Sequence, residues 1–149
     1  MRAIAFVALA FLLASCSSPS PELDSKASAA GHRMKVYYLE IVTADVDSVC
    51  AAYSAATGVE FGEPDALLGN ARTAALDGGG LIGVRATLHE SEEIVTRPYW
   101  LVDDIEAAVA AAAAAGGEVA HPPLEIPGRG TFAIYFLGGS QHGLWQLTR

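Results

Sequence analysis

From residue 35 onward, apolar and polar positions follow strand and helix patterns in turn. Residues 36–42 are rich in β-branched and aromatic side chains, which predicts a strand. Asp45 precedes a helical pattern that runs to about Thr57 and meets Gly58, so a capping residue and a terminating glycine bound a predicted helix. Further strands are predicted at residues 59–61, 71–76 and 81–88, with a turn formed by glycines 78–80 between the last two.

The second half of the chain repeats this succession. Its predicted elements are a strand at 99–102, a helix from Asp104 to Ala115 ended by two glycines, and strands at 118–120, 131–137 and 144–147. Superposing the halves at an offset of 59 positions aligns Asp45 with Asp104 and Gly58 with Gly117. The repeat predicts one α+β domain, residues 34–149, built from two βαβββ modules at about 35–90 and 95–149.

The first residues of the chain have a different character. Arg2 is followed by an apolar run over residues 3–13, too short to span a bilayer as a helix, which predicts a signal peptide over residues 1–15. Leu13-Ala14-Ser15-Cys16 resembles the bacterial lipobox, in which the cysteine receives a lipid; the alternative is an ordinary secretory leader with an incidental cysteine. Residues 16–33 are rich in Ser, Pro and Ala, as a disordered tether would be. We therefore expect lipidation at Cys16 and anchoring to the bacterial cell envelope, with the outer membrane as one destination.

The net charge and the motifs missing from the sequence exclude several classes of function. Seventeen acidic against nine basic residues give a net charge of −8, which argues against nucleic acid as a partner. The sequence has no phosphate-binding loop, dinucleotide-binding glycine pattern or nucleophile elbow. His89 lies among Glu90, Glu92 and Glu93, a composition that favours a solvated charged loop over a cation site.

Three short sequence segments are informative when they are taken together. They are Glu40-Ile41 leading to Ala44-Asp45-Val46-Asp47 and Tyr53, the run from Tyr99 to Ala108, and Gly143-Leu144-Trp145-Gln146 near the end. Together they resemble the vicinal oxygen chelate superfamily, which includes glyoxalase I, extradiol dioxygenases, and bleomycin and fosfomycin resistance proteins. The resemblance implies that curled sheets of the two modules form a cleft for a small molecule, commonly in a dimer. Exposed sheet edges also make a homodimer the expected state.

Members of this superfamily that use a metal hold it with His, Glu or Gln on the first and last strands of each module. In this chain the resemblance places the first-strand positions on Tyr38 and Arg97, and the last position of the second module on or near Gly143. Arginine cannot ligate a cation, because its guanidinium stays protonated. We therefore expect no metal and no other cofactor. The alternative is a retained divalent metal held by Glu40 and Gln146 with help from a partner subunit.

Strand alternation selects the candidate ligand-binding residues, because every second side chain of a curled sheet faces the cleft. The ligand positions that the resemblance implies select which face this is. On their parity lie Tyr38, Glu40, Arg97, Tyr99 and Trp145, whereas Arg85 and Gln146 are assigned to the opposite face. Glu40 and an arginine could equally form a buried ion pair. His142, in the final turn, is a further candidate for ligand contact, and Arg129 lies in a glycine-rich loop that could cover the cleft.

The expected function is a membrane-anchored glyoxalase-like domain that binds a small organic molecule in a metal-free cleft. Two alternatives remain open. One is a metal-dependent lyase, isomerase or dioxygenase. The other is a non-catalytic envelope interaction module, in which side chains such as Trp145 and Tyr99 fill the cleft.

Overall fold

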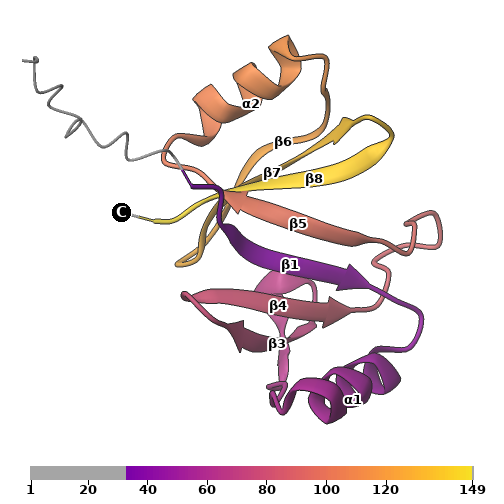
Figure 1. Ribbon diagram of the computed structural model, residues 1–149. Helices are drawn as coiled ribbons and strands as arrows, with labels where there is room; N and C mark the ends of the chain where they lie inside the picture. Colours follow the sequence, from indigo (N-terminus) through magenta and orange to yellow (C-terminus); the bar gives the residue numbers. More distant parts are fainter. Residues whose placement is uncertain (1–32, 149) are drawn as a thin grey trace, which may run out of the picture. The chain divides into compact units, whose positions relative to one another are not determined.

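The structure is a computed structural model that describes residues 33–148 (Figure 1). The predicted signal peptide, Cys16 and almost all of the predicted tether lie outside the described residues. Among the residues that are described, no helix is both long and apolar enough to span a membrane.

The first predicted strand and helix are confirmed. Strand β1 is Val36–Val42 and helix α1 is Val46–Thr57. The Asp45 carboxylate caps α1 by accepting a hydrogen bond from the Ser48 backbone N–H at 3.1 Å. Gly58 ends the helix in the left-handed conformation, with φ of 76°, and its N–H donates to the Ser54 carbonyl.

In the rest of the first module, one of the predicted strands is absent. Residues 59–61 form no strand, because Val59 and Phe61 pack into the core beneath α1 instead of pairing. The pairing comes later, in the short strand β2 (Pro64–Asp65), followed by the 3₁₀ helix η1 (Ala66–Leu68). Strands β3 (Ala71–Leu76) and β4 (Gly80–Arg85) then form the predicted hairpin, whose turn places Gly78 and Gly79 at positive φ.

The second module repeats this arrangement. Strand β5 is Thr96–Leu101, and helix α2 is Ile105–Ala114, capped by the Asp104 carboxylate. Strands β6 (Glu118–Ile126), β7 (Gly130–Leu137) and β8 (Ser140–Gln146) follow. Strand β6 is longer than predicted, because shifts in its pairing with β7 accommodate the two prolines within it.

All strands join one sheet in the order β2-β3-β4-β1-β5-β8-β7-β6. The modules meet where β1 and β5 pair antiparallel, placing Tyr38 beside Tyr99 and Glu40 beside Arg97. Each of these strands pairs on its other side with a parallel strand, β4 or β8, so the two halves are related by an approximate twofold axis. This arrangement confirms the predicted α+β fold of two βαβββ modules.

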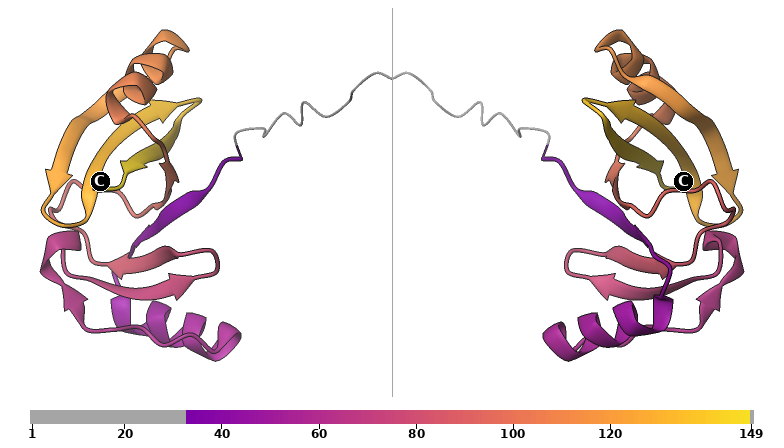
Figure 2. Two further views of the ribbon diagram at one scale, coloured as in Figure 1. Left: turned by 90° about the vertical axis from the view of Figure 1, so that its left-hand side faces the viewer. Right: turned by 90° about the vertical axis from the view of Figure 1, so that its right-hand side faces the viewer.

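The two faces of the sheet bury different sets of side chains. Helices α1 and α2 pack on one face, over clusters around Ile41 and Leu144, and lie at opposite ends of the sheet (Figures 1 and 2). The other face carries an aromatic cluster of Tyr38, Tyr99 and Trp145. Because side chains alternate along each strand, the residues that support the helices and those that can line a cleft are set by sequence parity.

Candidate functional site

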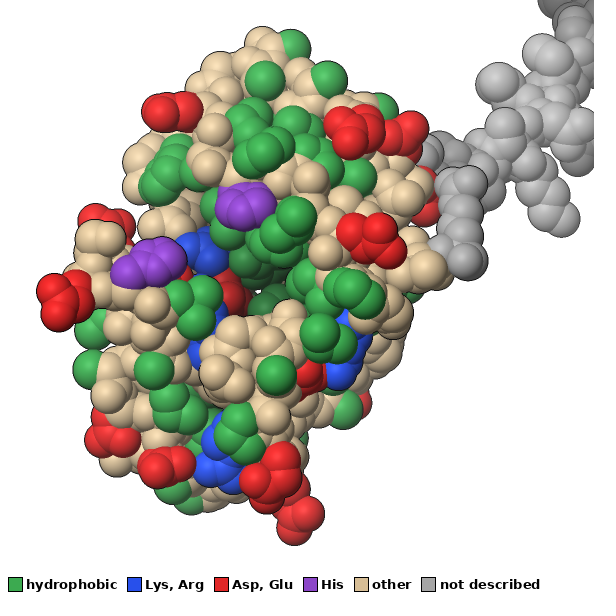
Figure 3. All heavy atoms as spheres, turned by 180° about the vertical axis from the view of Figure 1, so that it is seen from behind, with side chains coloured by type: hydrophobic (Ala, Val, Ile, Leu, Met, Phe, Trp, Pro, Cys, Tyr) green, Lys and Arg blue, Asp and Glu red, His purple; other side chains and the backbone are tan. Residues whose placement is uncertain are grey.

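A cavity of about 580 Å³ lies on the face of the sheet opposite helices α1 and α2. Figure 3 shows it as a hollow, with histidine side chains at its rim and charged side chains to one side. Five of the six predicted ligand-binding residues line it, all buried: Tyr38, Glu40, Arg97, Tyr99 and Trp145. Trp145 and Tyr99 form part of the wall and do not fill the space, in contrast to the expectation for an interaction module with a closed cleft.

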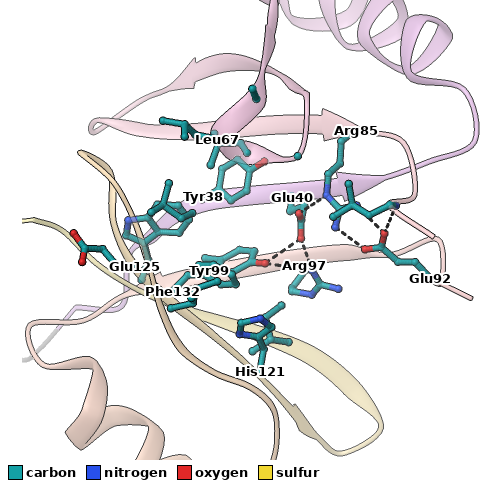
Figure 4. A pocket seen from close by; sticks show the side chains of 18 of the residues that line it. Tyr38, Glu40, Leu67, Arg85, Glu92, Arg97, Tyr99, His121, Glu125 and Phe132 are labelled. Atoms are coloured by element: carbon teal, nitrogen blue, oxygen red, sulfur yellow. Dashed lines mark hydrogen bonds and ion pairs between the residues drawn. The ribbon is translucent and has the colours of Figure 1, made fainter.

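One end of the cavity is a network of charged groups centred on Glu40 (Figure 4). One carboxylate oxygen, Oε1, accepts a hydrogen bond from Arg85 Nε at 2.7 Å. The other, Oε2, accepts from Arg97 Nη1 and from the Tyr99 hydroxyl. Glu40, Arg85 and Arg97 are each at most 5% exposed. Both oxygens of Glu40 therefore accept hydrogen bonds from within the protein. This is the buried ion pair with an arginine that the sequence analysis gave as an alternative to ligand contact.

The two arginines are completed by other partners. Arg85 makes a two-pronged ion pair with Glu92, at 2.5 and 2.9 Å. Arg97 donates to the Gln141 side-chain oxygen and, at 3.2 Å, to the Tyr99 hydroxyl oxygen. Two guanidinium groups thus face two carboxylates, and this end of the cavity is electrically neutral as a whole.

Arg85 and Glu92 correct the sequence prediction. In the parallel pairing of β1 with β4, Glu40 is level with Gly83, so Arg85 points to the cleft and not to the opposite face. Glu92 is not part of a solvated loop, because its carboxylate also accepts the Leu88 backbone N–H at 2.6 Å and its side chain is only 15% exposed.

Gln146, His142 and Arg129 lie elsewhere. The Gln146 side-chain oxygen accepts a hydrogen bond from the Ile105 N–H at the start of α2. His142 has the opposite parity to Trp145 and stacks on Tyr135 at 5.3 Å, so it is not among the residues that line the cavity. Arg129 forms an ion pair with Asp65, which ties the second module to the first.

The other end of the cavity is aromatic, and sequence reasoning found only part of it. The Phe132 ring packs against both Trp145 and Tyr99, with centroid distances of 6.3 and 6.2 Å, and His121 stacks on Phe132 at 5.0 Å. Alternation along β7 could have identified Phe132. His121 could not be assigned, because its direction depends on irregular pairing of β6.

Tyr38 and Tyr99 are neighbours across the pairing of β1 with β5 but differ in hydrogen bonding. The Tyr99 hydroxyl donates to Glu40 and accepts from Arg97, whereas the buried Tyr38 hydroxyl has no hydrogen-bond partner among the described residues. Burial raises the pKa of both hydroxyls, so both remain protonated. Only one of the two tyrosines therefore stabilises the folded protein through its hydroxyl.

Substituting each tyrosine by phenylalanine tests this difference. Tyr38→Phe is expected to raise the free energy of unfolding by about 1 kcal/mol, because it removes an unsatisfied buried hydroxyl. Tyr99→Phe is expected to lower it by about 1–2 kcal/mol, because it removes two hydrogen bonds to charged groups. Urea unfolding of both variants measures the difference, and an equal loss in both would contradict it.

The Glu92–Arg85 pair makes stability depend on acid pH. The hydrogen bonds from Arg85 lower the pKa of Glu92 from 4.5 to about 2. A carboxyl with a lowered folded-state pKa contributes stability above its unfolded pKa and loses it as the pH falls. Between about pH 4.5 and 2 the unfolding free energy is therefore expected to fall by about 2 kcal/mol from this group alone. Glu92→Gln should flatten that part of the profile, while Glu90→Gln, at an exposed neighbour, should leave it unchanged.

The polar groups of the cleft do not fit a divalent metal. Four strands contribute one polar side chain each at its charged end: Glu40, Arg85, Arg97 and Gln141. Two of these are guanidiniums, which have no lone pair to offer, and the Glu40 oxygens already accept from them. Across residues 33–148, no three His, Cys, Asp or Glu side chains are grouped so that they could hold a metal ion.

The order of the strands identifies the fold. The two βαβββ modules in one curled sheet are the vicinal oxygen chelate, or glyoxalase-like, fold, as solved structures show. Methylmalonyl-CoA epimerase from Mycobacterium tuberculosis is similar over 75% of this chain and 87% of its own, with a TM-score of 0.60 and 17% identity. A hypothetical protein from Bacillus halodurans gives a TM-score of 0.61 at 14% identity, over 78% of this chain and 96% of its own.

A third similar structure contains a ligand. It is a single-residue variant of methylmalonyl-CoA epimerase from Streptomyces coelicolor in complex with 2-nitronate-propionyl-CoA. Its TM-score is 0.57 at 16% identity, over 76% of this chain and 94% of its own. No protein-family model and no curated protein sequence matches the chain. At these identities the likeness concerns the fold.

Proposed function

We propose that the domain binds a small organic molecule in this cleft and holds it without a metal ion. The observation that carries the proposal is a cavity with an aromatic end, formed by Tyr99, Phe132 and Trp145, beside a charged end whose groups already pair with one another. Its volume of about 580 Å³ is in the range of small-molecule sites, which are mostly apolar with a few fixed polar groups.

Two features support binding without a metal. The guanidiniums of Arg85 and Arg97 already neutralise the carboxylates at the end of the cleft, Glu40 and Glu92. A divalent cation would add two positive charges without counter-charges to this neutral group, in a site of low dielectric constant. It would also have to take the Glu40 oxygens from two charge-assisted hydrogen bonds.

A thermal-shift screen tests the binding proposal. Uncharged aromatic compounds, metabolites and antibiotics would be added to the purified protein, and a ligand at about 100 times its Kd should stabilise the fold by about 2.7 kcal/mol. Phe132→Lys, which places a charge in the aromatic end, should abolish the shift. Tyr53→Lys, on the outer side of α1, should preserve it. A broad screen with no shift would refute the proposal.

A second candidate is an enzyme, which the structural likeness to methylmalonyl-CoA epimerases favours. Metal analysis and an epimerase assay distinguish the two. After incubation with zinc, nickel, manganese or ferrous iron and then dialysis, the binding-protein proposal expects no retained ion. About one retained ion per chain, together with turnover of methylmalonyl-CoA, would replace it with the metal-dependent enzyme.

We further propose that lipid at Cys16 anchors this domain to the cell envelope, on the strength of the lipobox-like sequence alone. Cys16→Ala should move the protein from the detergent phase to the soluble fraction. Cys50→Ala, at the other cysteine, should leave partitioning unchanged. Homodimerisation also remains a prediction, which sedimentation of the purified protein can check.

A further inference from the structure

His121 points into the cleft because the pairing of strand β6 with β7 is irregular around it. Strand β6 is an edge strand, and its register with β7 shifts on both sides of His121. Across the sheet, His121 is level with Ile134, and Leu124 with Phe132. In a regular strand, residues 121 and 124 would face opposite sides. The shift at the two prolines puts both on the cavity wall, and bulges of this kind commonly redirect a side chain at a site.

Two contacts hold the His121 ring in place. It stacks on Phe132, and its Nδ1 lies 2.8 Å from the Pro122 carbonyl oxygen. A carbonyl oxygen can only accept, so this contact selects the tautomer with the proton on Nδ1, in which Nε2 is an acceptor. The ring is half-buried and lies on the cavity wall (Figure 4).

The other polar groups of the cleft leave little for an anionic ligand. The guanidiniums of Arg85 and Arg97 are engaged by Glu40, Glu92 and Gln141. Glu125, on the cavity lining, adds a negative charge. A polyanion would therefore meet a neutral to acidic site with no unpaired arginine, whereas an uncharged ring would meet the aromatic wall.

We propose that His121 is a ligand-binding residue that selects an uncharged aromatic molecule with a hydroxyl group. The aromatic part of the ligand packs on Phe132 and Trp145, and its hydroxyl donates a hydrogen bond to His121 Nε2. This inference rests on the proposed function, since it names the chemistry of the ligand of that same cleft.

Two probes of matched shape test it: 2-naphthol, which has the hydroxyl, and 2-methylnaphthalene, which has a methyl group in its place. In mildly alkaline buffer, titration of the full chain should show 2-naphthol binding about five- to tenfold more tightly. His121→Phe keeps a ring on Phe132 but removes the acceptor, so it should abolish the preference while retaining both compounds. His142→Phe, the matched change at a histidine that does not line the cavity, should keep the preference.

The outcomes separate this inference from the proposed function. If both probes bind but His121→Phe leaves the preference unchanged, His121 is not the acceptor and the cleft remains a binding site. If neither probe binds the wild-type chain, the ligand class is wrong, and the thermal-shift screen decides independently whether the cleft binds anything. Nitrogen NMR of the imidazole gives a third reading: a proton on Nε2 in the free protein would overturn the assignment.

Discussion

Replacement of Glu40 by glutamine is expected to lower the free energy of unfolding by about 3–5 kcal/mol. The substitution keeps the shape of the side chain but removes the carboxylate that faces two buried guanidiniums, Arg85 and Arg97. Breaking a buried ion pair from one side is costly because the remaining charge stays in a site of low dielectric constant. Chemical denaturation followed by tryptophan fluorescence measures the loss.

Glu60→Gln is the matched control, because Glu60 is exposed. It should change the unfolding free energy by less than about 0.5 kcal/mol. A similar small effect for both variants would show that water or neighbouring groups compensate the two arginines, and the account of a closed, self-paired network would then be wrong.

Gly143→Ala is expected to cost about 3 kcal/mol or to prevent folding. A Cβ atom at this position would lie 2.2 Å from Cδ1 of the Tyr99 ring, which rests directly on the glycine. That ring cannot move away easily, because it is buried and packs against Tyr38, Phe132 and Trp145. Thermal unfolding of the variant gives the size of the effect.

Two further variants make this prediction specific. Gly62→Ala should be tolerated, because its Cβ would meet only an ordinary contact of 3.7 Å. Adding Tyr99→Leu to Gly143→Ala should recover part of the stability, since leucine has no ring over the glycine. If the double variant is as unstable as the sum of the single changes, the clash with the ring is not the cause.

Local signals predicted the elements well. Asp45 and Gly58 bound the first helix as their chemistry requires, and the repeat at an offset of 59 positions placed the second module. The cleft face followed from the ligand positions that the resemblance implies, extended along each strand by alternation, and Tyr38, Glu40 and Trp145 all line the cavity. The caps and the alternation needed only neighbouring residues in the chain.

The missed features depend on how separate strands align. Arg85 was assigned to the wrong face because the register of β4 against β1 is not written in either strand alone. Glu92 reaches Arg85 from a loop whose path the sequence does not give. His121 faces the cavity only because the pairing of β6 shifts around it, and the two prolines beside it were the only signal.

The pairing of β1 with β5 has a consequence for any occupant of the cleft. Two identical modules around a twofold axis would offer a ligand two equivalent poses. At the repeat offset of 59 positions, the axis relates a carboxylate to a neutral hydroxyl, Glu40 to Tyr99, and another neutral hydroxyl to a guanidinium, Tyr38 to Arg97. The cleft between the two modules is therefore asymmetric. A ligand bound in one orientation has a different binding energy from the same ligand turned around the axis.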